Sequence, residues 1–295
     1  MNTPHRIGFI GLGMMGHPMS ACLAKADYPL FLLDADPART RQVIDELHAT
    51  LLDDGNVGQL DVLITMLPNS AIVESVLLGE GGQGGWAEKL PRGATVIDMS
   101  SSEPARSRAL GERLEQAGLA YLDAPVSGGV KRAVDGSLAI LAGGRAEVLE
   151  PCRSLLEAMG RSVLHIGAAG AGHAAKALNN YVSAAGLVAT VEALHVAQRF
   201  GIEPQVMVDV LNASTGRSNT SENKAGQFML SGSYASGFSL QLMDKDLNIA
   251  LALADALGYP MPLGKACTAL WDQASKRSDA RTDHTEMYRL LDPSV

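Results

Sequence analysis

The chain has 295 residues, of which 46% are hydrophobic and 19% are charged, a composition typical of a globular protein large enough for two domains. Its 32 acidic residues outnumber its 24 lysines and arginines, so the formal net charge is −8. This balance argues against a nucleic acid or an anionic membrane as the partner, because both need a basic face, but it is compatible with a small anionic substrate.

The cysteines and the N-terminus indicate the compartment. Cys22, Cys152 and Cys267 are far apart and lack metal-ligand spacing, so we expect reduced core thiols and no metal site. The N-terminus has no cleavable apolar segment, and no stretch reaches the roughly 18 apolar residues of a membrane span. The sequence therefore predicts a cytoplasmic protein.

A glycine motif follows the first apolar run. Residues 7–16 read IGFIGLGMMG, a strand that leads into G-x-G-x-x-G. The first glycine permits a tight turn, the second lets the backbone approach a pyrophosphate, and the third lets the next helix pack closely. The phosphates are expected at that helix's N-terminus. The predicted dinucleotide loop consists of Gly11, Leu12, Gly13, Met14, Met15 and Gly16; a glycine-rich turn without a ligand is the alternative.

A carboxylate follows the second strand. Residues 30–33 are apolar and end in Asp34, which lies 18 positions beyond Gly16. This is close to the spacing of about 20 expected for the carboxylate that binds the adenosine ribose. We therefore expect NAD to be favoured over NADP. Arg39 and Arg41 could partly compensate the charge of a 2′-phosphate, but we expect them to face solvent from the following helix.

Further apolar runs alternate with helical segments and predict a parallel sheet of about eight strands, covered on both faces. These runs are residues 62–67, 94–99, 119–122, 138–142 and 163–166. Asp36 and Pro37 form a typical helix start. Ligands of such sheets bind at the carboxyl ends of the strands. We therefore assign cofactor contacts to Leu67, Pro68 and Ser101, with Asn69 and Ser100 at the same edge.

From about Gly167 the sequence is nearly all helix-forming. The predicted helices span residues 171–200, 204–212, 237–258 and 262–276, and residues 213–239 are predicted to be a loop that flanks a pocket. The chain is therefore predicted to be an α/β protein with a Rossmann-type domain at residues 1–166 and an all-α domain at residues 167–295. The long helix at 171–200 is expected to connect them.

Two segments could bind and convert a substrate. Ser127, Gly128 and Gly129 offer a hydroxyl and unshielded backbone N–H groups, a suitable cradle for a carboxylate, although a plain connection is the alternative. Lys176 and Asn180 are four residues apart on a helix and share one face. Only apolar residues surround Lys176 in sequence, and a desolvated lysine has a lowered pKa that suits acid/base catalysis. The alternative is a lysine that extends to solvent.

Two neighbouring positions complete the predicted site. Asn179 is assigned to substrate binding beside Asn180. Lys245 could reach the cofactor or the substrate from a later helix, while Asp246 holds it or another cation; a solvated charged pair is the alternative.

Four motifs follow one another along the chain: the glycine loop at 11–16, Ser-Gly-Gly at 127–129, the segment with Lys176 and Asn180, and Lys245-Asp246. In this order they resemble the motifs of the β-hydroxyacid dehydrogenase family, which includes 3-hydroxyisobutyrate dehydrogenase and tartronate semialdehyde reductase. The resemblance covers essentially the whole chain. It implies an active site in the cleft between the domains, with Lys176 as acid/base, Asn180 and the Ser127–Gly129 turn orienting the substrate, and Lys245 lining the cleft. It also implies a homodimer or homotetramer built through the helical domain.

The expected reaction is hydride transfer between a nicotinamide cofactor and a small 3-hydroxy acid or its semialdehyde, with NAD favoured over NADP. Arg132 and Arg217 depart from the family pattern and could favour a more highly charged acid, whereas Lys131 is expected to face solvent. An imine reductase of the same superfamily and a non-catalytic dinucleotide-binding module are the alternatives. Lys176 and the carboxylate cradle argue against the imine reductase, and the acidic charge and the Lys176/Asn180 pair argue against the non-catalytic module.

Overall fold

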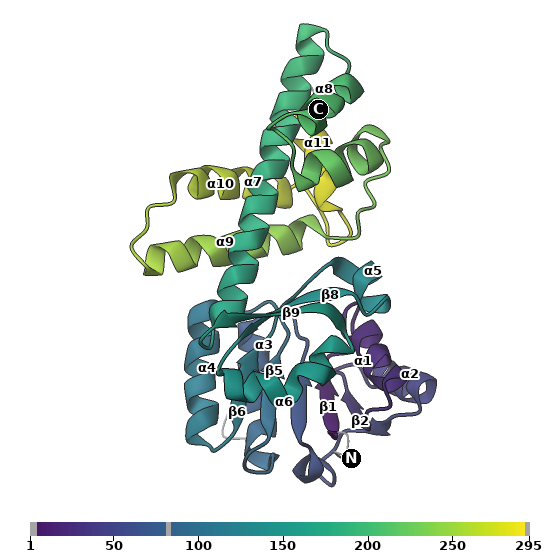
Figure 1. The fold of residues 1–295 in the computed structure, drawn as a ribbon, viewed down its shortest axis with the longest axis vertical. Helices are drawn as coiled ribbons and strands as arrows, with labels where there is room; N and C mark the ends of the chain where they lie inside the picture. The colour runs from purple at the N-terminus through teal and green to yellow at the C-terminus, as the bar shows by residue number, and fades with distance from the viewer. Residues whose placement is uncertain (1–4, 81–83, 293–295) are drawn as a thin grey trace. The chain divides into compact units, whose positions relative to one another are not determined.

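The computed structural model describes residues 5–80 and 84–292, and the chain divides into two compact units, Met1–Lys176 and Ala177–Val295 (Figure 1). The boundary predicted at residue 166 lies just before helix α7 (Ala171–Phe200), whereas the compact units divide within the second turn of that helix. Each unit is described by itself below.

The first unit is built on a nine-stranded sheet with the order β3-β2-β1-β4-β5-β6-β8-β7, in which β9 also pairs with β8. The strands are β1 (Ile7–Ile10), β2 (Leu30–Leu33), β3 (Thr50–Leu51), β4 (Val62–Thr65), β5 (Thr95–Asp98), β6 (Ala120–Asp123), β7 (Val126–Ser127), β8 (Leu138–Gly143) and β9 (Gly160–Gly167). Strands β1 to β6 are parallel and follow the 3-2-1-4-5-6 order of a dinucleotide-binding fold.

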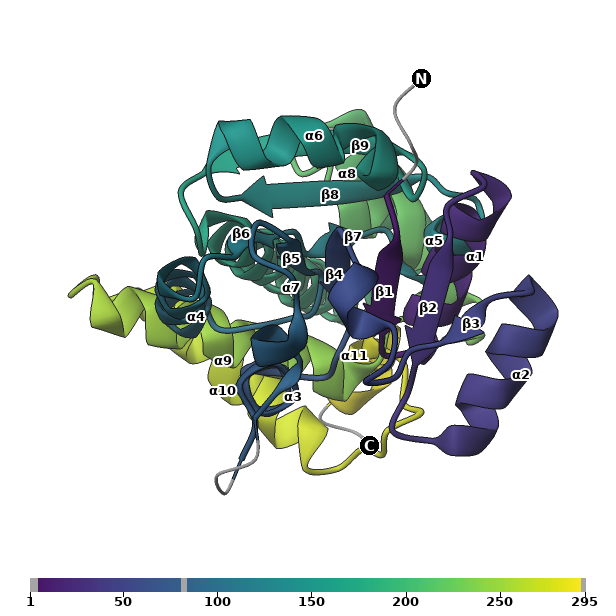
Figure 2. The ribbon, with the colours of Figure 1, turned by 90° about the horizontal axis from the view of Figure 1, so that it is seen from below.

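Helices cover both faces of this sheet. They are α1 (Gly16–Lys25), α2 (Pro37–Leu47), α3 (Ser70–Leu78), α4 (Pro104–Gln116), α5 (Gly129–Val134) and α6 (Ala146–Glu157), with short 3-10 turns η1 (Val57–Gln59) and η2 (Trp86–Lys89). Phe9 and Leu122 pack in one core with α1, α2 and α6, whereas Ile10 and Tyr121 pack in another with α3 and α4. Figure 2 shows α1 and α6 on one side of the strands and α3 and α4 on the other. The predicted Rossmann-type architecture is confirmed.

The predicted sheet differs from the structure in two respects. It has nine strands rather than eight, because β3 and β7 contain two residues each and carry no detectable periodicity. It is also not wholly parallel: β8 runs antiparallel to both β6 and β7. For β7 and β8 the short connection through α5 explains this, because a parallel pair needs a crossover of about a dozen residues or more.

The second unit is helical. After α7 it contains α8 (Pro204–Ala213), the π-helix η3 (Ser221–Leu230), α9 (Leu240–Ala256), α10 (Pro262–Ser275), the 3-10 turn η4 (His284–Glu286) and α11 (Met287–Leu290). The predicted bounds of α7 are confirmed. Helix α9 begins at Leu240 rather than at residue 237, because Ser239 caps it by accepting the N–H of Leu242 at 3.4 Å.

The segment predicted as a loop at residues 213–239 contains η3, so that prediction is wrong. Ala225 and Met229 of η3 are buried with α7, α9 and α10 around Trp271. Their burial outweighs the serine- and glycine-rich composition of the segment, because tertiary packing readily overrides weak local propensity.

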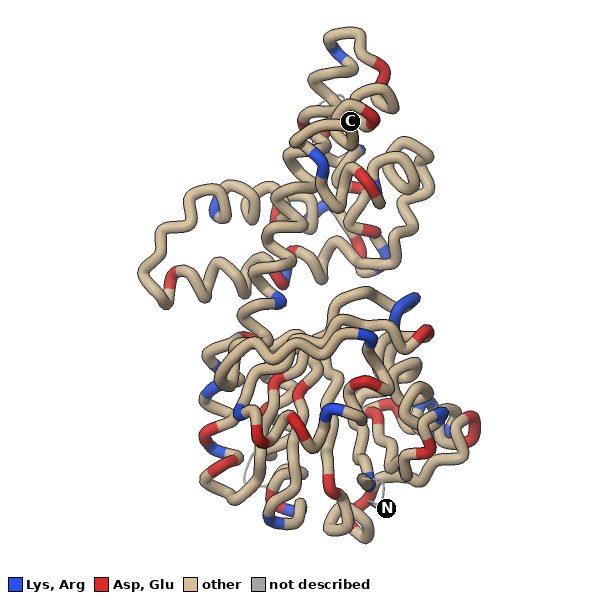
Figure 3. Tube along the Cα trace, viewed as in Figure 1, with Lys and Arg blue, Asp and Glu red and all other residues tan. Residues whose placement is uncertain are grey.

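Three general features concern the described part of the chain as a whole. No helix in it is both long and apolar enough to span a membrane. Cys22, Cys152 and Cys267 are buried and form no disulfide. Figure 3 shows acidic and basic residues interspersed along both units.

Candidate active site

The glycine loop has the geometry of a pyrophosphate cradle. Gly11 has a φ of +100°, and a Cβ there would lie 2.3 Å from the Met66 carbonyl oxygen. A Cβ on Gly16 would lie 1.8 Å from the Gly11 carbonyl oxygen. At Gly13, by contrast, a Cβ meets nothing within 4 Å. Two glycines therefore serve packing, and the middle one leaves open backbone that a phosphate could approach, so the loop fits a dinucleotide.

The N-terminus of α1 adjoins this loop. Met15 precedes the helix and provides no side-chain cap, and Met14 is 73% exposed. The first N–H groups of α1 are therefore not capped by a side chain, and together with the helix dipole they favour an anion.

Asp34 holds the same loop. Its Oδ2 accepts the N–H of Leu12 at 2.6 Å and its Oδ1 accepts that of Asp36 at 2.9 Å. The expectation that Arg39 faces solvent is wrong: its Nε donates to the Leu12 carbonyl oxygen at 2.8 Å, because α2 directs the side chain back to the loop. Arg41 is exposed, as expected.

The carboxyl ends of β4 and β5 lie next to each other. The N–H of Leu67 donates to Ser100 Oγ at 2.8 Å, which joins the two strand ends. Pro68 is exposed and Ser101 is half-buried at the same edge. The residues assigned to the cofactor from this edge are thus brought together.

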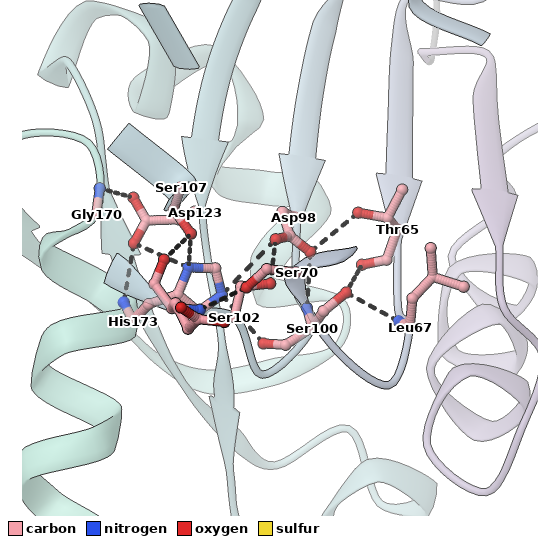
Figure 4. A network of polar contacts seen from close by, with 11 residues as sticks. Thr65, Leu67, Ser70, Asp98, Ser100, Ser102, Ser107, Asp123, Gly170 and His173 are labelled. Carbon is pink, nitrogen blue, oxygen red and sulfur yellow. Dashed lines mark hydrogen bonds and ion pairs between the residues drawn. The ribbon is translucent and has the colours of Figure 1, made fainter. Parts of the chain in front are cut away.

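A buried polar network lies behind this edge, and the sequence analysis missed it (Figure 4). Asp98 and Asp123 end neighbouring strands, and both are fully buried with His173 between them. Asp98 accepts hydrogen bonds from Thr65 Oγ1 at 3.0 Å and from Ser102 Oγ at 2.9 Å. A signal was present, because an acidic residue at the end of an apolar strand recurs in adjacent strands.

Asp123 fixes the start of α7. Its Oδ1 accepts the N–H of Gly170 at 2.7 Å and its Oδ2 accepts that of His173 at 2.8 Å. Burial raises the pKa of Asp123, and the neighbouring His173 and these two N–H groups oppose the rise. The carboxylate thus replaces hydrogen-bond partners that the first turn of a helix lacks.

Lys176 lies against the predicted carboxylate cradle. Its Nζ donates to the Val126 carbonyl oxygen at 2.6 Å, and Val126 directly precedes Ser127. Gly128 and Gly129 have φ values of +136° and +68°, and a Cβ on Gly129 would meet nothing within 4 Å. The structure therefore brings the lysine and the Ser-Gly-Gly turn together within the first unit.

Two basic residues, Lys131 and Arg132, follow this turn in sequence. The stem of Arg132 lies against Gly128, since its Cδ would be 2.6 Å from a Cβ there, and its side chain is largely exposed. Lys131 is exposed, as expected.

Asn180 is held by Asp246. Its Nδ2 donates to Asp246 Oδ2 at 2.7 Å, and its Oδ1 accepts from Asn179 Nδ2 at 3.2 Å. Lys245 Nζ lies 3.8 Å from Asp246 Oδ1, and burial lowers the pKa of Lys245. Asp246 thus holds Asn180, a contact that the sequence did not reveal, although its interaction with Lys245 was anticipated.

A further cation of the second unit was missed. Lys224 in η3 is half-buried, and its Nζ donates to Ser183 Oγ on α7 at 3.3 Å. Arg217, which the sequence singled out instead, is exposed and pairs with Glu222. Within residues 5–80 and 84–292, no group of three or more His, Cys, Asp or Glu side chains is arranged to hold a metal ion.

Two family models match successive parts of the chain. Residues 6–167 match the NAD binding domain of 6-phosphogluconate dehydrogenase. Residues 170–291 match a family described as NAD-binding of NADP-dependent 3-hydroxyisobutyrate dehydrogenase. Together they cover nearly the whole chain.

Individual relatives match over their full length. The chain is 32% identical over 291 residues to 2-(hydroxymethyl)glutarate dehydrogenase of Eubacterium barkeri, covering 98% of this chain and 96% of the relative. It is 35% identical over 300 residues to the NAD-dependent L-serine dehydrogenase of Pseudomonas aeruginosa, covering 98% of each. A solved structure of Mycobacterium tuberculosis 3-hydroxyisobutyrate dehydrogenase with L-serine matches with a TM-score of 0.90 at 31% identity, covering 98% of this chain and 100% of that one.

Imine reductases share the fold at a greater distance. That of Myxococcus stipitatus, as a variant with NAD⁺, matches with a TM-score of 0.66 at 20% identity over 98% of this chain and 100% of that one, which indicates a common fold alone. The relatives at 32% and 35% identity are instead a 2-(hydroxymethyl)glutarate dehydrogenase and an NAD-dependent L-serine dehydrogenase. With these relatives, the glycine loop, the Ser-Gly-Gly turn and the lysine of α7, the chain belongs to the β-hydroxyacid dehydrogenase family.

Proposed function

We propose that the protein oxidises a small 3-hydroxy acid to its semialdehyde, or catalyses the reverse reduction, with Lys176 as the acid/base. One observation carries the proposal: Lys176 Nζ lies 2.6 Å from the Val126 carbonyl oxygen, directly beside the Ser127–Gly129 turn. A proton acceptor and a carboxylate cradle in this proximity suit a molecule that bears a hydroxyl two carbons from its carboxylate.

Lys176 moves the proton. In the oxidation direction its neutral amine takes the proton of the substrate hydroxyl while the carbonyl bond forms, and in reduction its ammonium returns that proton. NAD, when bound, supplies the redox chemistry by taking up the hydride of the carbinol carbon. The hydrogen bond to Val126 fixes the amine in place, and positioned proton transfer contributes typically about 10²- to 10⁴-fold to the rate.

The other site residues bind and orient the substrate. Ser127 Oγ and the backbone N–H groups of Gly128 and Gly129 are proposed to bind the carboxylate. Asn180 is proposed to contact the substrate hydroxyl with its second amide N–H, because Asp246 occupies the first. Asn179, which donates to Asn180 Oδ1, supports that orientation.

Most of the residues proposed to bind the cofactor belong to the first unit. The open backbone at Gly13 and the start of α1 would hold the pyrophosphate, and Asp34 the adenosine ribose. Leu67, Pro68 and Ser101 would line the nicotinamide side, with Lys245 as a further contact. NAD is the expected cofactor, and NADP-dependent members occur in the family.

The relatives differ in the group beside the carboxylate of their substrates. 2-(Hydroxymethyl)glutarate has there a two-carbon arm that ends in a second carboxylate, 3-hydroxyisobutyrate a methyl group and serine an ammonium group. All three contain a carboxylate and a hydroxymethyl group on one carbon. We propose that this common part defines the reaction of the chain.

The test is a spectrophotometric assay at 340 nm with hydroxy acids that vary in the side group, each with NAD and NADP. We expect NADH formation with at least one 3-hydroxy acid. We expect little with 2-hydroxy acids, because their hydroxyl is too close to the carboxylate to reach Lys176 when the carboxylate is bound at the Ser127–Gly129 turn. Reduction of a cyclic imine in place of any semialdehyde would instead favour the imine reductase alternative.

The expected assembly and compartment also remain proposals. We propose a homodimer or homotetramer built through the second unit, where several large apolar side chains are exposed, among them Val182, Phe200, Leu257, Tyr259 and Leu263. Light scattering of the full chain tests this. The three buried, unpaired cysteines support a reducing compartment such as the cytoplasm.

A further inference from the structure

Lys224 is a half-buried lysine of η3. Within the described ranges 5–80 and 84–292, no carboxylate oxygen lies within 4.0 Å of its Nζ, and its hydrogen bond goes to the neutral Ser183 Oγ at 3.3 Å. Burial lowers the pKa of Lys224, and the carboxylate of Asp283 opposes the shift only in part. A buried ammonium is costly unless it is paired, so the position calls for a function.

The partner serine places Lys224 on the substrate-binding side of α7. Ser183 follows Asn180 by three residues and Lys176 by seven, so these three residues share one face of the helix. The ammonium of Lys224 therefore contacts the same helical face that carries the proposed acid/base and the proposed substrate amide.

Asp283 acts on Lys224 electrostatically, but within the described residues the two side chains form no ion pair within 4.0 Å. The carboxylate of Asp283 is saturated by five donors: Ser236 Oγ, the N–H groups of Gly237, Phe238 and Thr285, and Thr285 Oγ1. Burial and the ammonium of Lys224 lower the pKa of His284 to about 4, so this imidazole is neutral at pH 7.

His284 adds a second unsatisfied group near Lys224. Its Nδ1 donates to the Phe238 carbonyl oxygen at 3.0 Å, which leaves Nε2 as an acceptor. This Nε2 is buried and finds no hydrogen-bond partner in the part of the chain that the structure describes. A buried polar atom without a partner is rare in native proteins and is expected where a ligand or a water binds.

A second lysine lies near this face of α7. Lys245 Nζ lies 3.8 Å from Asp246 Oδ1, and the other oxygen of this carboxylate accepts from Asn180. Burial lowers the pKa of Lys245 as well. Two half-buried lysines thus lie toward this face of α7, Lys245 beside Asp246 and Lys224 under the weaker electrostatic influence of Asp283. In addition, Lys224 lies in a π-helix, an element that often marks functional sites.

We propose that Lys224 is a specificity-determining residue that binds a second anionic group of the substrate. The substrate class is then a hydroxy acid with a second carboxylate, rather than one with a methyl or an ammonium group in that place. A methyl group would leave the ammonium unpaired, and an ammonium group would be repelled. The inference rests on the proposed function and names the substrate class for the same site.

Binding of two unreactive acids tests the proposal without turnover. Glutarate has two carboxylates and butyrate has one, and neither has a hydroxyl to oxidise. We expect the full-length enzyme with saturating NAD to bind glutarate at least about tenfold more tightly by calorimetry, the lower range for a charge-assisted hydrogen bond. Lys224→Met should abolish this preference and leave butyrate binding within about twofold, whereas Lys224→Arg should retain it.

The matched control is Lys265→Met. Lys265 is an exposed lysine of α10 whose Nζ lies 3.9 Å from Asp255, so its loss should change neither affinity. Equal affinity of the wild type for both acids, or an equal loss for both in Lys224→Met, would overturn the inference. If the preference depends on Lys224 but no hydroxy acid is oxidised, the anion site stands and the proposed function is wrong.

Discussion

Asp123 and His173 join the end of β6 to the first turn of α7, since Asp123 Oδ2 accepts the backbone N–H of His173 at 2.8 Å. The ring of His173 extends the connection, because its Nε2 lies 3.1 Å from the Ser100 carbonyl oxygen and its Nδ1 lies 2.8 Å from Ser107 Oγ. A carbonyl only accepts, so Nε2 carries the proton. Lys176 follows less than one turn later, and its position depends on this turn.

The first prediction is that His173 is a positioning residue for Lys176. His173→Leu leaves the Ser100 carbonyl oxygen buried without its donor, at a cost of about 1–3 kcal/mol, and lets the first turn shift. We expect kcat to fall at least about tenfold, because a 1 Å misplacement can cost about 10²-fold. His173→Gln should restore most of kcat, since its amide can donate to Ser100 and accept from Ser107.

The control lies on the same helix. His195 is also buried, and its Nε2 bonds the Tyr288 carbonyl oxygen at 2.8 Å, so His195→Leu should lower the melting temperature without changing kcat. If His173→Leu lowers only the melting temperature too, His173 is structural and has no positioning role.

The second prediction concerns Lys176 itself. Lys176→Met keeps the length of the side chain but removes the proton acceptor, so we expect kcat to fall by about 10²- to 10⁴-fold. NAD affinity, measured by fluorescence quenching or calorimetry, should be unchanged. Lys276→Met serves as control because Lys276 is exposed and pairs with Asp272 at 2.6 Å. Activity near that of the wild type in Lys176→Met would refute the assignment.

The third prediction is that alanine has different effects at Gly128 and Gly129, the two glycines of the carboxylate cradle. A Cβ on Gly129 meets nothing within 4 Å, so apart from backbone strain Gly129→Ala should affect only a bound acid, raising its KM with NAD affinity preserved. A Cβ on Gly128 would press on the stem of Arg132 at 2.6 Å, so Gly128→Ala should lower the melting temperature further than Gly129→Ala does.

Gly258→Ala is the matched control for backbone strain. Gly258 has a φ of +69°, close to the +68° of Gly129, and a Cβ there also meets nothing within 4 Å. Both changes should cost about 1–2 kcal/mol of stability, but only Gly129→Ala should raise the KM for the acid. An unchanged KM would mean that the turn is a plain connection.

Local signals accounted for much of the fold. The long apolar run between Gly170 and Gly201 predicted the bounds of α7, and Asp36 with Pro37 predicted the start of α2, where Asp36 indeed accepts the N–H of Ala38. These features depend on residues near one another in sequence. The two-residue strands β3 and β7 depend on pairing with distant strands, so no local pattern could reveal them.

In the site, too, the features formed by neighbouring residues could be predicted, and those formed by distant residues could not. The glycine loop and the Ser-Gly-Gly turn are contiguous motifs and were visible in the sequence. The partners of Asn180 and Lys224 are not: Asp246 is 66 positions from Asn180, and Ser183 is 41 positions from Lys224. Burial in the tertiary structure decides that Lys224, rather than the exposed Arg217, lies against α7.

The fourth prediction concerns acid stability. The pKa of His284 is lowered from its usual 6.5 to about 4, so the folded state binds fewer protons than the unfolded state between these pH values. The stability that neutral His284 provides is therefore complete above pH 6.5, falls as the pH drops toward 4, and levels off below that. The loss is at most about 3 kcal/mol.

Urea unfolding of the wild type and of His284→Gln at pH 7.5, 5.5 and 4.5 measures the contribution of His284 to the free energy of unfolding. The glutamine can still donate to Phe238 but does not titrate, and the other histidines are common to both proteins. We expect the wild type to lose more stability than the variant between pH 7.5 and 4.5. Parallel curves would show that His284 is not the group responsible.

The last prediction is the cofactor preference, which depends on Asp34 and Arg39. Asp34 is aligned by the N–H of Leu12 at 2.6 Å, and a carboxylate there accepts from a ribose 2′-hydroxyl but repels a 2′-phosphate. We therefore expect a higher kcat/KM with NAD than with NADP. Arg39 limits this preference, because its guanidinium is bound to the Leu12 carbonyl oxygen at 2.8 Å, beside the same loop, rather than turned to solvent.

The two residues can be separated by a double-mutant comparison of kcat/KM for both cofactors. Asp34→Ser should narrow the preference by removing the repulsion, and NADP activity should then depend on Arg39 as the remaining charged group. Adding Arg39→Met to Asp34→Ser should lower NADP activity again, whereas Arg39→Met alone should affect NAD little. Arg41→Met is the control, since Arg41 belongs to the same helix but is exposed. A wild type that prefers NADP would rule out Asp34 as the ribose partner, because a carboxylate facing the 2′-phosphate would oppose that preference.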